Sequence, residues 1–440
     1  MFFCILVLIY LVLLITLLQW TYKYEVIFFT IYIFGFTSFI YFLAIPLELF
    51  FFEKDSFVVT KIALKVREHN LVSIAVLSIF SLIGFSSALL IGQFFLHIFP
   101  TRKIQSNNNL LEEKSVEKCI LITTLIGIIM LIVFCYDTIF HSIVSYKDSY
   151  TNRYSSALFS FLISLISLGL SVFGVMNFRK HTVSGILIGL GCLFLVFIMG
   201  TILYYKILIL PALCGLFFYF FGYKRIKPIY LILLTTIMVP FLLFFLAAFS
   251  TYRANVPADK IVKAIIWKMS FTRSDPAGPM VSILHELNKD APLILGNTYT
   301  NIFTIFTPKI FFPNRPLDLA EKFAKEMIVN WKPGQGLAFS PLAEAYMNFG
   351  YYGALIQYFI FGMIWSGVWG IVRRCFFKEF FESYLVFYYV VGLSTLILTF
   401  RSSFSAFPKI LLMNIAPFLL VLFVAKRMKL NLCKNKKINL

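Results

Sequence analysis

Long apolar runs follow one another along almost the whole chain, and they limit its possible folds more than any other feature. A helix needs about twenty apolar residues to cross the hydrocarbon of a bilayer. Runs of roughly this length lie at 2–19, 26–47, 71–99, 119–135, 155–176, 183–199, 203–222, 229–250, 350–372, 383–400 and 409–425. Charged residues make up 13% of the chain, about half the share usual in soluble domains. The sequence therefore predicts an all-α polytopic integral membrane protein with about 11 (10–12) transmembrane helices.

One long polar stretch interrupts these runs and divides the chain into four predicted regions. Residues 1–250 form an N-terminal transmembrane bundle of about eight helices, and residues 251–349 form a large extracytoplasmic loop. Residues 350–425 form the C-terminal transmembrane helices, and residues 426–440 form a basic tail. The loop holds most of the polar residues that could carry chemistry.

Basic residues indicate the orientation of the predicted helices. A dense cluster beside a final span normally stays in the cytoplasm, and the tail holds Lys426, Arg427, Lys429, Lys434, Lys436 and Lys437. Counting back from it places the loop 251–349 outside. The count also places the N-terminus and the basic segment 48–70 outside, against the usual bias. Either a helix near the start is missed or miscounted, or 48–70 is an interfacial amphipathic segment.

Composition and motifs exclude several classes of function. The net charge of +19 arises largely from short loops and the tail, as membrane orientation requires, so we expect no nucleic acid partner. The seven Cys include no C-x-x-C pair, and His285 has no His or Cys at ligand spacing. No nucleotide-binding loop or nucleophile elbow occurs. We therefore expect no cofactor and a metal-independent reaction. Residues 2–18 lack the flanking features of a signal peptide and are expected to remain as the first helix.

The loop contains a rigid basic segment from 306 to 316. Three prolines fix the backbone around Lys309 and Arg315. Guanidinium and ammonium groups held beside a membrane suit a phosphate ester or pyrophosphate. An alternative is that this segment touches anionic lipid head groups.

A carboxylate lies where the loop meets the next span. Glu344 and Asn348 are four residues apart and so share one helical face at the start of the run 350–372. Partial burial there would raise the pKa of Glu344 and suit it as a general base. The alternative is that Glu344 pairs with a nearby Arg and anchors the helix.

Several cations are expected on the same outer side as the loop. Arg253 and Arg401 lie at outer ends of predicted spans, and Arg153 and Arg273 also fall on that side. Single arginines at helix ends commonly snorkel. Several on one side, against the positive-inside bias, indicate a cavity for an anionic substrate.

The chain resembles the family of bacterial O-antigen polymerases, which join oligosaccharide repeat units. The layout of spans with one large late loop covers the whole chain, and the local likeness is strongest from Gly296 to Gly353. It rests on Gly296-x-x-Tyr299, on Pro308-Lys309 with Pro313-x-Arg315-Pro316, and on Glu344-Ala345-Tyr346-x-Asn348-Phe349-Gly350-x-x-Gly353. Lys309 stands where Arg often follows the proline in such proteins.

The resemblance implies a fold similar to membrane glycosyltransferases of the GT-C type and a glycosyl transfer at the outer face of the cytoplasmic membrane. The substrate would be an undecaprenyl-pyrophosphate-linked oligosaccharide, and partners would include a flippase and a chain-length regulator. Glu344 would deprotonate the acceptor hydroxyl, and Tyr346 and Asn348 would orient the sugar or the carboxylate. Pyrophosphate would be bound by Arg253, Arg273, Lys309, Arg315 and Arg401, with Arg153 as a further candidate.

The sequence also leaves two other functions open. An O-antigen ligase has a similar layout, but it transfers finished glycans to a lipid core. A flippase or transporter of lipid-linked sugars would need cations deep in the membrane and usually two related halves, and neither is evident in the sequence.

Overall fold

The structure, a computed structural model, describes most of the predicted spans. It covers residues 1–22, 24–52, 56–59, 62–98, 113–144, 157–202, 209–219, 258–273, 276–289, 291–302, 316–332, 335–375 and 384–412, with short pieces elsewhere. Within these residues, seven helices are long and apolar enough to cross a membrane: Phe2–Thr21, Val26–Phe51, Glu68–Phe95, Val116–Phe134, Phe161–Arg179, Val183–Gly200 and Tyr351–Val372. They match seven predicted runs and confirm an all-α polytopic membrane protein.

The remaining predicted runs are partly described. The run 383–400 is divided into two shorter helices, α17 (Tyr384–Gly392) and α18 (Ser394–Thr399). The runs 203–222, 229–250 and 409–425 lie largely outside the described residues, apart from α9 (Ile209–Phe217) and short pieces. The expected total of about eleven helices stays a prediction.

The chain forms two compact units, each built from separate parts of the sequence. Unit 1 comprises Met1–Phe94, Ile226–Ser366 and Leu396–Ile410, and unit 2 comprises Phe95–Arg225, Gly367–Thr395 and Leu411–Leu440. Unit 1 contains the whole predicted extracytoplasmic loop 251–349, and the candidate site lies within this unit. The four predicted regions are defined by the side of the membrane on which each lies, whereas the two units are defined by packing. The four regions therefore stay a prediction.

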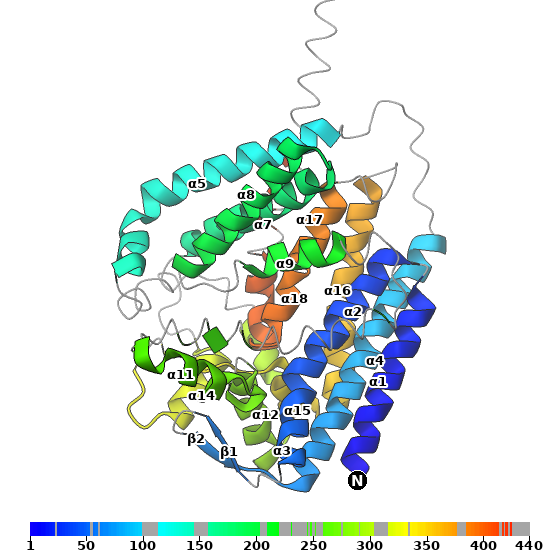
Figure 1. The fold of residues 1–440 in the computed structure, drawn as a ribbon. Coiled ribbons are helices and arrows are strands. Elements are labelled where there is room, and N and C mark those ends of the chain that lie inside the picture. Colours follow the sequence, from blue (N-terminus) through cyan, green and yellow to red (C-terminus); the bar gives the residue numbers. More distant parts are fainter. Residues whose placement is uncertain are drawn as a thin grey trace, which may run out of the picture. The chain divides into compact units, whose positions relative to one another are not determined.

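The long helices of unit 1 are α1 (Phe2–Thr21), α2 (Glu25–Ser38), α4 (Glu68–Ile98) and α16 (Tyr351–Cys375), of which the first three are drawn in blue shades in Figure 1. Helix α2 continues through a π-helical turn, η1 (Phe39–Leu43), into α3 (Ala44–Phe51). Pro46 in α3 has no N–H, and its ring would crowd the carbonyl of Phe42 in a regular helix. The π turn precedes it directly and adjusts the backbone within a single apolar span.

Glycines allow α4 and α16 to approach each other closely. A Cβ at Gly362 would lie 2.4 Å from the backbone oxygen of Phe85, and a Cβ at Gly84 would lie 2.3 Å from that of Leu355. Two aromatic rings, Phe34 of α2 and Phe85 of α4, stack 3.9 Å apart beside this contact. Small residues at such crossings bring backbones together where the hydrophobic effect between helices is weak.

The basic segment 48–70 contains a β-hairpin, which neither alternative from the sequence anticipated. Strands β1 (Ser56–Val59) and β2 (Ile62–Lys65) pair antiparallel, with Val59 opposite Ile62. Helix α12 (Ala277–Asn288) packs on both strands, and the Asn288 Nδ2 donates to the Lys65 carbonyl at 2.9 Å. The Asn70 Nδ2 donates to the Asn288 Oδ1, also at 2.9 Å. The hairpin and the predicted loop 251–349 therefore lie on the same side of the membrane.

The predicted loop folds into short helices. These include α11 (Ile261–Lys268), α12, α14 (Leu319–Met327) and α15 (Pro341–Phe349), with the 3-10 turns η4 (Ala258–Lys260), η5 (Phe271–Arg273) and η6 (Asn297–Thr300). Asp318 caps α14 by accepting a hydrogen bond from the Glu321 backbone N–H at 2.7 Å. Unit 1 thus places a folded segment at the ends of its membrane helices.

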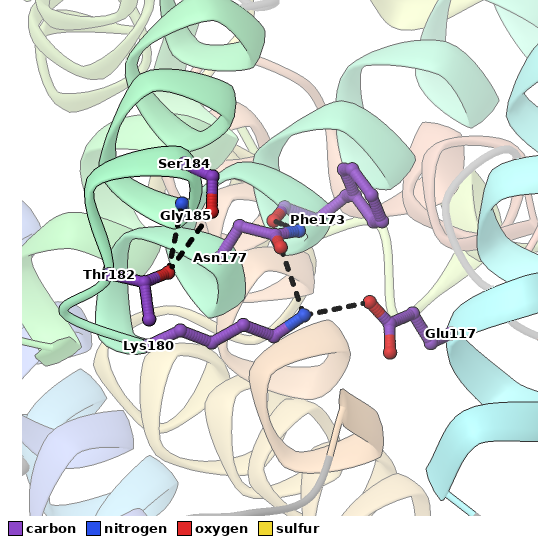
Figure 2. A network of polar contacts seen from close by, with 7 residues as sticks. All are labelled: Glu117, Phe173, Asn177, Lys180, Thr182, Ser184 and Gly185. Atoms are coloured by element: carbon purple, nitrogen blue, oxygen red, sulfur yellow. Dashed lines mark hydrogen bonds and ion pairs between the residues drawn. The ribbon is translucent and has the colours of Figure 1, made fainter.

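Unit 2 is a helical bundle in which α7 (Ala157–Arg179) packs against α5 (Glu113–Val144), α8 (Val183–Ile202), α9 and α17. The turn between α7 and α8 carries a polar network, drawn in Figure 2. The Lys180 Nζ lies 3.0 Å from both the Glu117 Oε1 of α5 and the Asn177 Oδ1 of α7. The Thr182 hydroxyl accepts from the Gly185 N–H at 3.1 Å and caps α8. The network joins three helices at one end of the unit.

The crossing of α4 and α16 leads to a matched pair of substitutions on α16. Gly362→Ala places a methyl group against the Phe85 backbone, whereas a Cβ at Gly367 meets nothing within 4 Å. We expect Gly362→Ala to cost about 1–3 kcal/mol of stability, and Gly367→Ala to be neutral or slightly stabilising. Thermal unfolding of the two variants in detergent, followed by fluorescence-detected gel filtration, compares them. Equal midpoints would contradict the close approach at Gly362.

Candidate functional site

The start of α15 is fixed by hydrogen bonds to α12. The Ser340 hydroxyl caps the helix by accepting from the Leu342 N–H at 3.1 Å, and Pro341 occupies the first turn. The Ser340 N–H donates to the Ser282 Oγ of α12 at 2.8 Å. Helix α15 therefore begins at a defined position on the folded loop.

The end of α15 turns sharply into α16. Gly350 has φ +61°, a left-handed value that favours glycine, and its N–H donates to the Tyr346 carbonyl at 2.8 Å. A Cβ at Gly353 would lie 2.0 Å from the Ala345 carbonyl oxygen, so only glycine fits there. Gly353 therefore permits close packing of α15 and α16. Helices α15 and α16 therefore hold the side chains that lie between them in fixed positions.

Glu344 is fully buried at the centre of this arrangement. Its Oε2 accepts a hydrogen bond from the Ser405 backbone N–H at 3.2 Å, on the 3-10 turn η8 (Phe404–Ala406). Its Oε1 is buried and has no hydrogen-bond partner of good geometry among the described residues. Burial raises the pKa of Glu344 from 4.5 to about 7, while smaller contributions from Thr298 and the turn at Phe404 and Ser405 lower it.

Asn348 shares the buried face of α15 with Glu344, as the spacing predicted. The Asn348 Nδ2 donates to the Thr298 Oγ1 at 2.6 Å and to the Glu344 backbone carbonyl at 2.8 Å. Because the Thr298 hydroxyl accepts from Asn348, its own proton is available to the Glu344 carboxylate. Asn348 therefore orients the hydroxyl group that stabilises the ionised form of Glu344.

Tyr299 links the segment 291–302 to α16. Its hydroxyl donates to the Gln357 Oε1 at 2.6 Å, and the Gln357 Nε2 donates to the Pro341 carbonyl at 2.7 Å. The ring lies edge-on to Phe404, with centroids 5.5 Å apart. Burial, and to a smaller extent the Glu344 charge, raises the pKa of Tyr299. Tyr299 therefore stays protonated and acts as a fixed hydrogen-bond donor.

Tyr346 lies on a different face of α15 from Glu344. The two residues are two positions apart, which is about 200° around a helix. The Tyr346 ring is half-buried and meets the Tyr351 ring at 5.6 Å. The structure therefore does not bring Tyr346 into the cluster around the carboxylate.

Two of the predicted cations are described, at different places in unit 1. Arg401 follows α18 in a turn, where its N–H donates to the Leu398 carbonyl at 3.2 Å, and it precedes Ser405 by four residues. Arg273 is exposed at the end of η5, a turn bound by Glu48 of α3. Arg153, Arg253, Lys309 and Arg315 lie outside the described residues.

Several members of the cluster have roles that the sequence did not predict. Thr298 and Tyr299 lie in the Gly296-x-x-Tyr299 pattern, which signalled the segment but no function. Ser405 lies four residues after Arg401 and binds Glu344 through its backbone N–H. A contact made by the backbone cannot be predicted from the residue type. Gln357 could have been singled out as the one amide within the apolar run 350–372.

The raised pKa of Glu344 predicts that the Glu344→Gln variant becomes more stable relative to the unchanged protein as pH rises. The native state holds a proton between the unfolded pKa of 4.5 and the folded value of about 7. The stability that this bound proton contributes is fully present below pH 4.5. It is lost as pH rises through 7, at a cost of about 3 kcal/mol. Thermal midpoints at pH 5 and pH 8 measure it. The exposed Glu68→Gln serves as the control, and an equal gain of Glu344→Gln at both pH values would contradict the shift.

Comparison with known proteins gives one match. The family model described as O-antigen polysaccharide polymerase Wzy matches residues 1–431. No curated protein and no solved structure matches the chain. Because the family model covers almost the whole sequence, the chain belongs to the O-antigen polysaccharide polymerase Wzy family, and it is a multi-pass membrane polymerase of the glycosyltransferase type that acts in O-antigen synthesis.

Proposed function

We propose that the protein polymerises oligosaccharide repeat units carried on a polyprenyl pyrophosphate, at the outer face of the bacterial cytoplasmic membrane. A sugar hydroxyl of the incoming unit attacks the anomeric carbon of the growing chain. The bond between that carbon and the pyrophosphate oxygen breaks, and the lipid pyrophosphate leaves. Family membership supports polymerisation over the ligase and transporter alternatives.

Glu344 is the proposed base in this reaction. The observation that carries the role is a fully buried carboxyl group with a pKa of about 7 and one oxygen without a partner among the described residues. A base is most effective when its pKa lies near the working pH. Glu344 Oε1 would take the proton of the acceptor hydroxyl, while Ser405 and Thr298 hold the carboxylate in position.

Access to Glu344 requires a movement. The side chain has no exposed surface, and the segments around Thr298 and Phe404 pack beside it. An acceptor sugar reaches Oε1 once one of these segments shifts. Closing again would exclude water, which protects the glycosyl donor from hydrolysis.

The cations of the outer side are proposed to bind pyrophosphate. Arg273 and Arg401 are described, and Lys309 follows Ile302 by seven residues, a reach of at most about 25 Å. Arg153, Arg253 and Arg315 complete the proposed set. Positive charge of this kind would stabilise the leaving pyrophosphate without a metal ion.

The basic tail 426–440 would lie in the cytoplasm, and 251–349 would lie outside. A flippase would deliver the lipid-linked units, and a chain-length regulator would set the length of the product.

The base assignment predicts a phenotype. Glu344→Gln is expected to abolish the surface polysaccharide ladder in a polymerase-deficient strain, because Gln keeps the shape and cannot accept the proton. Glu68→Gln is the control and should restore the normal ladder. Immunoblots confirm equal amounts of protein in the membrane. A ladder of normal length with Glu344→Gln would show that Glu344 is not the base.

Substitutions of Arg315 in the same assay distinguish a requirement for positive charge from a requirement for guanidinium geometry. We expect loss of the ladder with both Arg315→Ala and Arg315→Lys, because a bidentate guanidinium contact to phosphate needs the planar fork. Rescue by Lys would indicate that charge alone suffices. An unchanged ladder with Ala would remove Arg315 from the site.

The pKa of Glu344 also predicts a pH profile. Polymerisation of lipid-linked units in proteoliposomes should fall about tenfold per pH unit below pH 7, where Glu344 is protonated. Because Thr298 lowers the pKa of Glu344, Thr298→Val should move the midpoint to higher pH, and Thr298→Ser should leave it in place. A midpoint unaffected by Thr298→Val would separate the profile from Glu344.

A further inference from the structure

Helix α11 presents an apolar face that the rest of the described protein leaves uncovered. Val262 is 69% exposed, Ile266 is 66% exposed and Ile261 is 38% exposed. Val262 and Ile266 are four residues apart and therefore lie on one side of the helix. Lys260 and Lys263 are exposed beside them. Short helices with an apolar face and a basic border commonly lie in a membrane interface.

Hydrogen bonds place α11 near the end of a membrane helix. Helix α11 contacts the turn η5. Within η5, the Thr272 N–H donates to the Glu48 Oε2 at 3.1 Å and its hydroxyl donates to the Glu48 Oε1 at 2.8 Å. Ser270 just before η5 also donates to this carboxylate. Glu48 lies in the last turn of the span Val26–Phe51, so η5 and α11 lie at the boundary where that span ends.

The exposed side chains around that boundary are both apolar and positively charged. Phe51 and Phe52, which follow Glu48, are 70% and 69% exposed. Among the residues that the structure describes here, Arg273 on η5, Lys260 and Lys263 are exposed, and Asp259 is the single exposed acid. The face therefore combines apolar side chains that suit acyl chains with cations that suit phosphate groups.

We propose that α11, together with η5, lies in the plane of the membrane interface and binds the anionic lipid surface of its own bilayer. Ile261, Val262 and Ile266 enter the boundary of the acyl chains. Lys260 and Lys263 contact the phosphates of acidic lipids. This surface is distinct from the Glu344 cluster and does not depend on the proposed reaction.

Charge favours lipid over a second copy of the chain as the occupant. A symmetric contact between two copies of α11 would bring lysines of one copy near lysines of the other. Like charges brought together oppose such a contact, whereas acidic head groups neutralise them. The lipid surface is also the one partner that the Glu48 contact already places beside the helix.

Fluorescence quenching in the full-length protein tests the proposal. A fluorescent amino acid is incorporated at position 262 or at position 329, where Val329 is 100% exposed in the turn after α14. The protein is reconstituted in phosphatidylcholine vesicles with or without phosphatidylglycerol. Brominated acyl chains should quench position 262 about twofold or more over position 329, and iodide should quench position 329 more. The preference at position 262 should increase with phosphatidylglycerol.

Charge reversal supplies the matched comparison. Lys260→Glu with Lys263→Glu should reduce lipid quenching at position 262 in vesicles that contain phosphatidylglycerol. Lys322→Glu with Lys325→Glu, on the exposed side of α14, should leave it unchanged. Iodide quenching at position 262 equal to that at 329 would overturn the proposal. Protection of position 262 from both quenchers would also overturn it, because this would indicate a protein partner or a second copy. Lipid quenching at position 262 that is the same with and without phosphatidylglycerol would overturn it as well.

Discussion

The candidate site is organised around the burial of one carboxyl group, Glu344, where a folded loop meets a membrane helix. Removing Glu344 from water disfavours its charge, and the protein replaces only part of that lost hydration. The replacement comes from three separate parts of the sequence: α15, the segment that contains Thr298, and the turn that contains Ser405. The requirement to keep these three parts together explains much of the local structure. Gly353 brings α16 against α15, Gln357 joins Tyr299 to the start of α15, and aromatic rings fill the space between the segments.

The membrane helices could be predicted because hydrocarbon imposes a simple rule on length and composition. Seven predicted spans are present within a few residues of their expected limits. Details that depend on backbone geometry were not predictable in the same way. The π turn before Pro46 and the division of 383–400 at Leu393 are local changes of backbone geometry, whereas the hairpin at 56–65 packs on a helix distant in sequence. The strands of the hairpin are too short for a clear alternation of apolar and polar residues. The hairpin is stabilised by α12, which lies some two hundred residues later in the sequence.

The candidate site was predictable where helical spacing sets the geometry and unpredictable where the backbone supplies the contact. Glu344 and Asn348 share a face because they are four residues apart, and the structure confirms it. Tyr346 belongs to the same sequence pattern but points to another face, which the helical period also dictates. The Ser405 N–H could not be inferred, since any residue type except proline provides one. The roles proposed for Lys309 and the arginines rest on charge and sidedness, and four of these six cations lie outside the described residues.

Two carboxylates near the membrane boundary show opposite solutions to the cost of burying charge. Glu48 receives hydrogen bonds from Ser270 and from both the N–H and the hydroxyl of Thr272, and this set ties η5 to the end of a span. Glu344 receives the Ser405 N–H on one oxygen, and its other oxygen lacks a well-placed donor among the described residues. A structural anchor is best served by full satisfaction, because each missing hydrogen bond costs stability. An incompletely satisfied carboxylate with a pKa of about 7 is a poor anchor and an effective proton acceptor. The contrast favours a chemical role for Glu344 over the alternative in which it only fixes the helix.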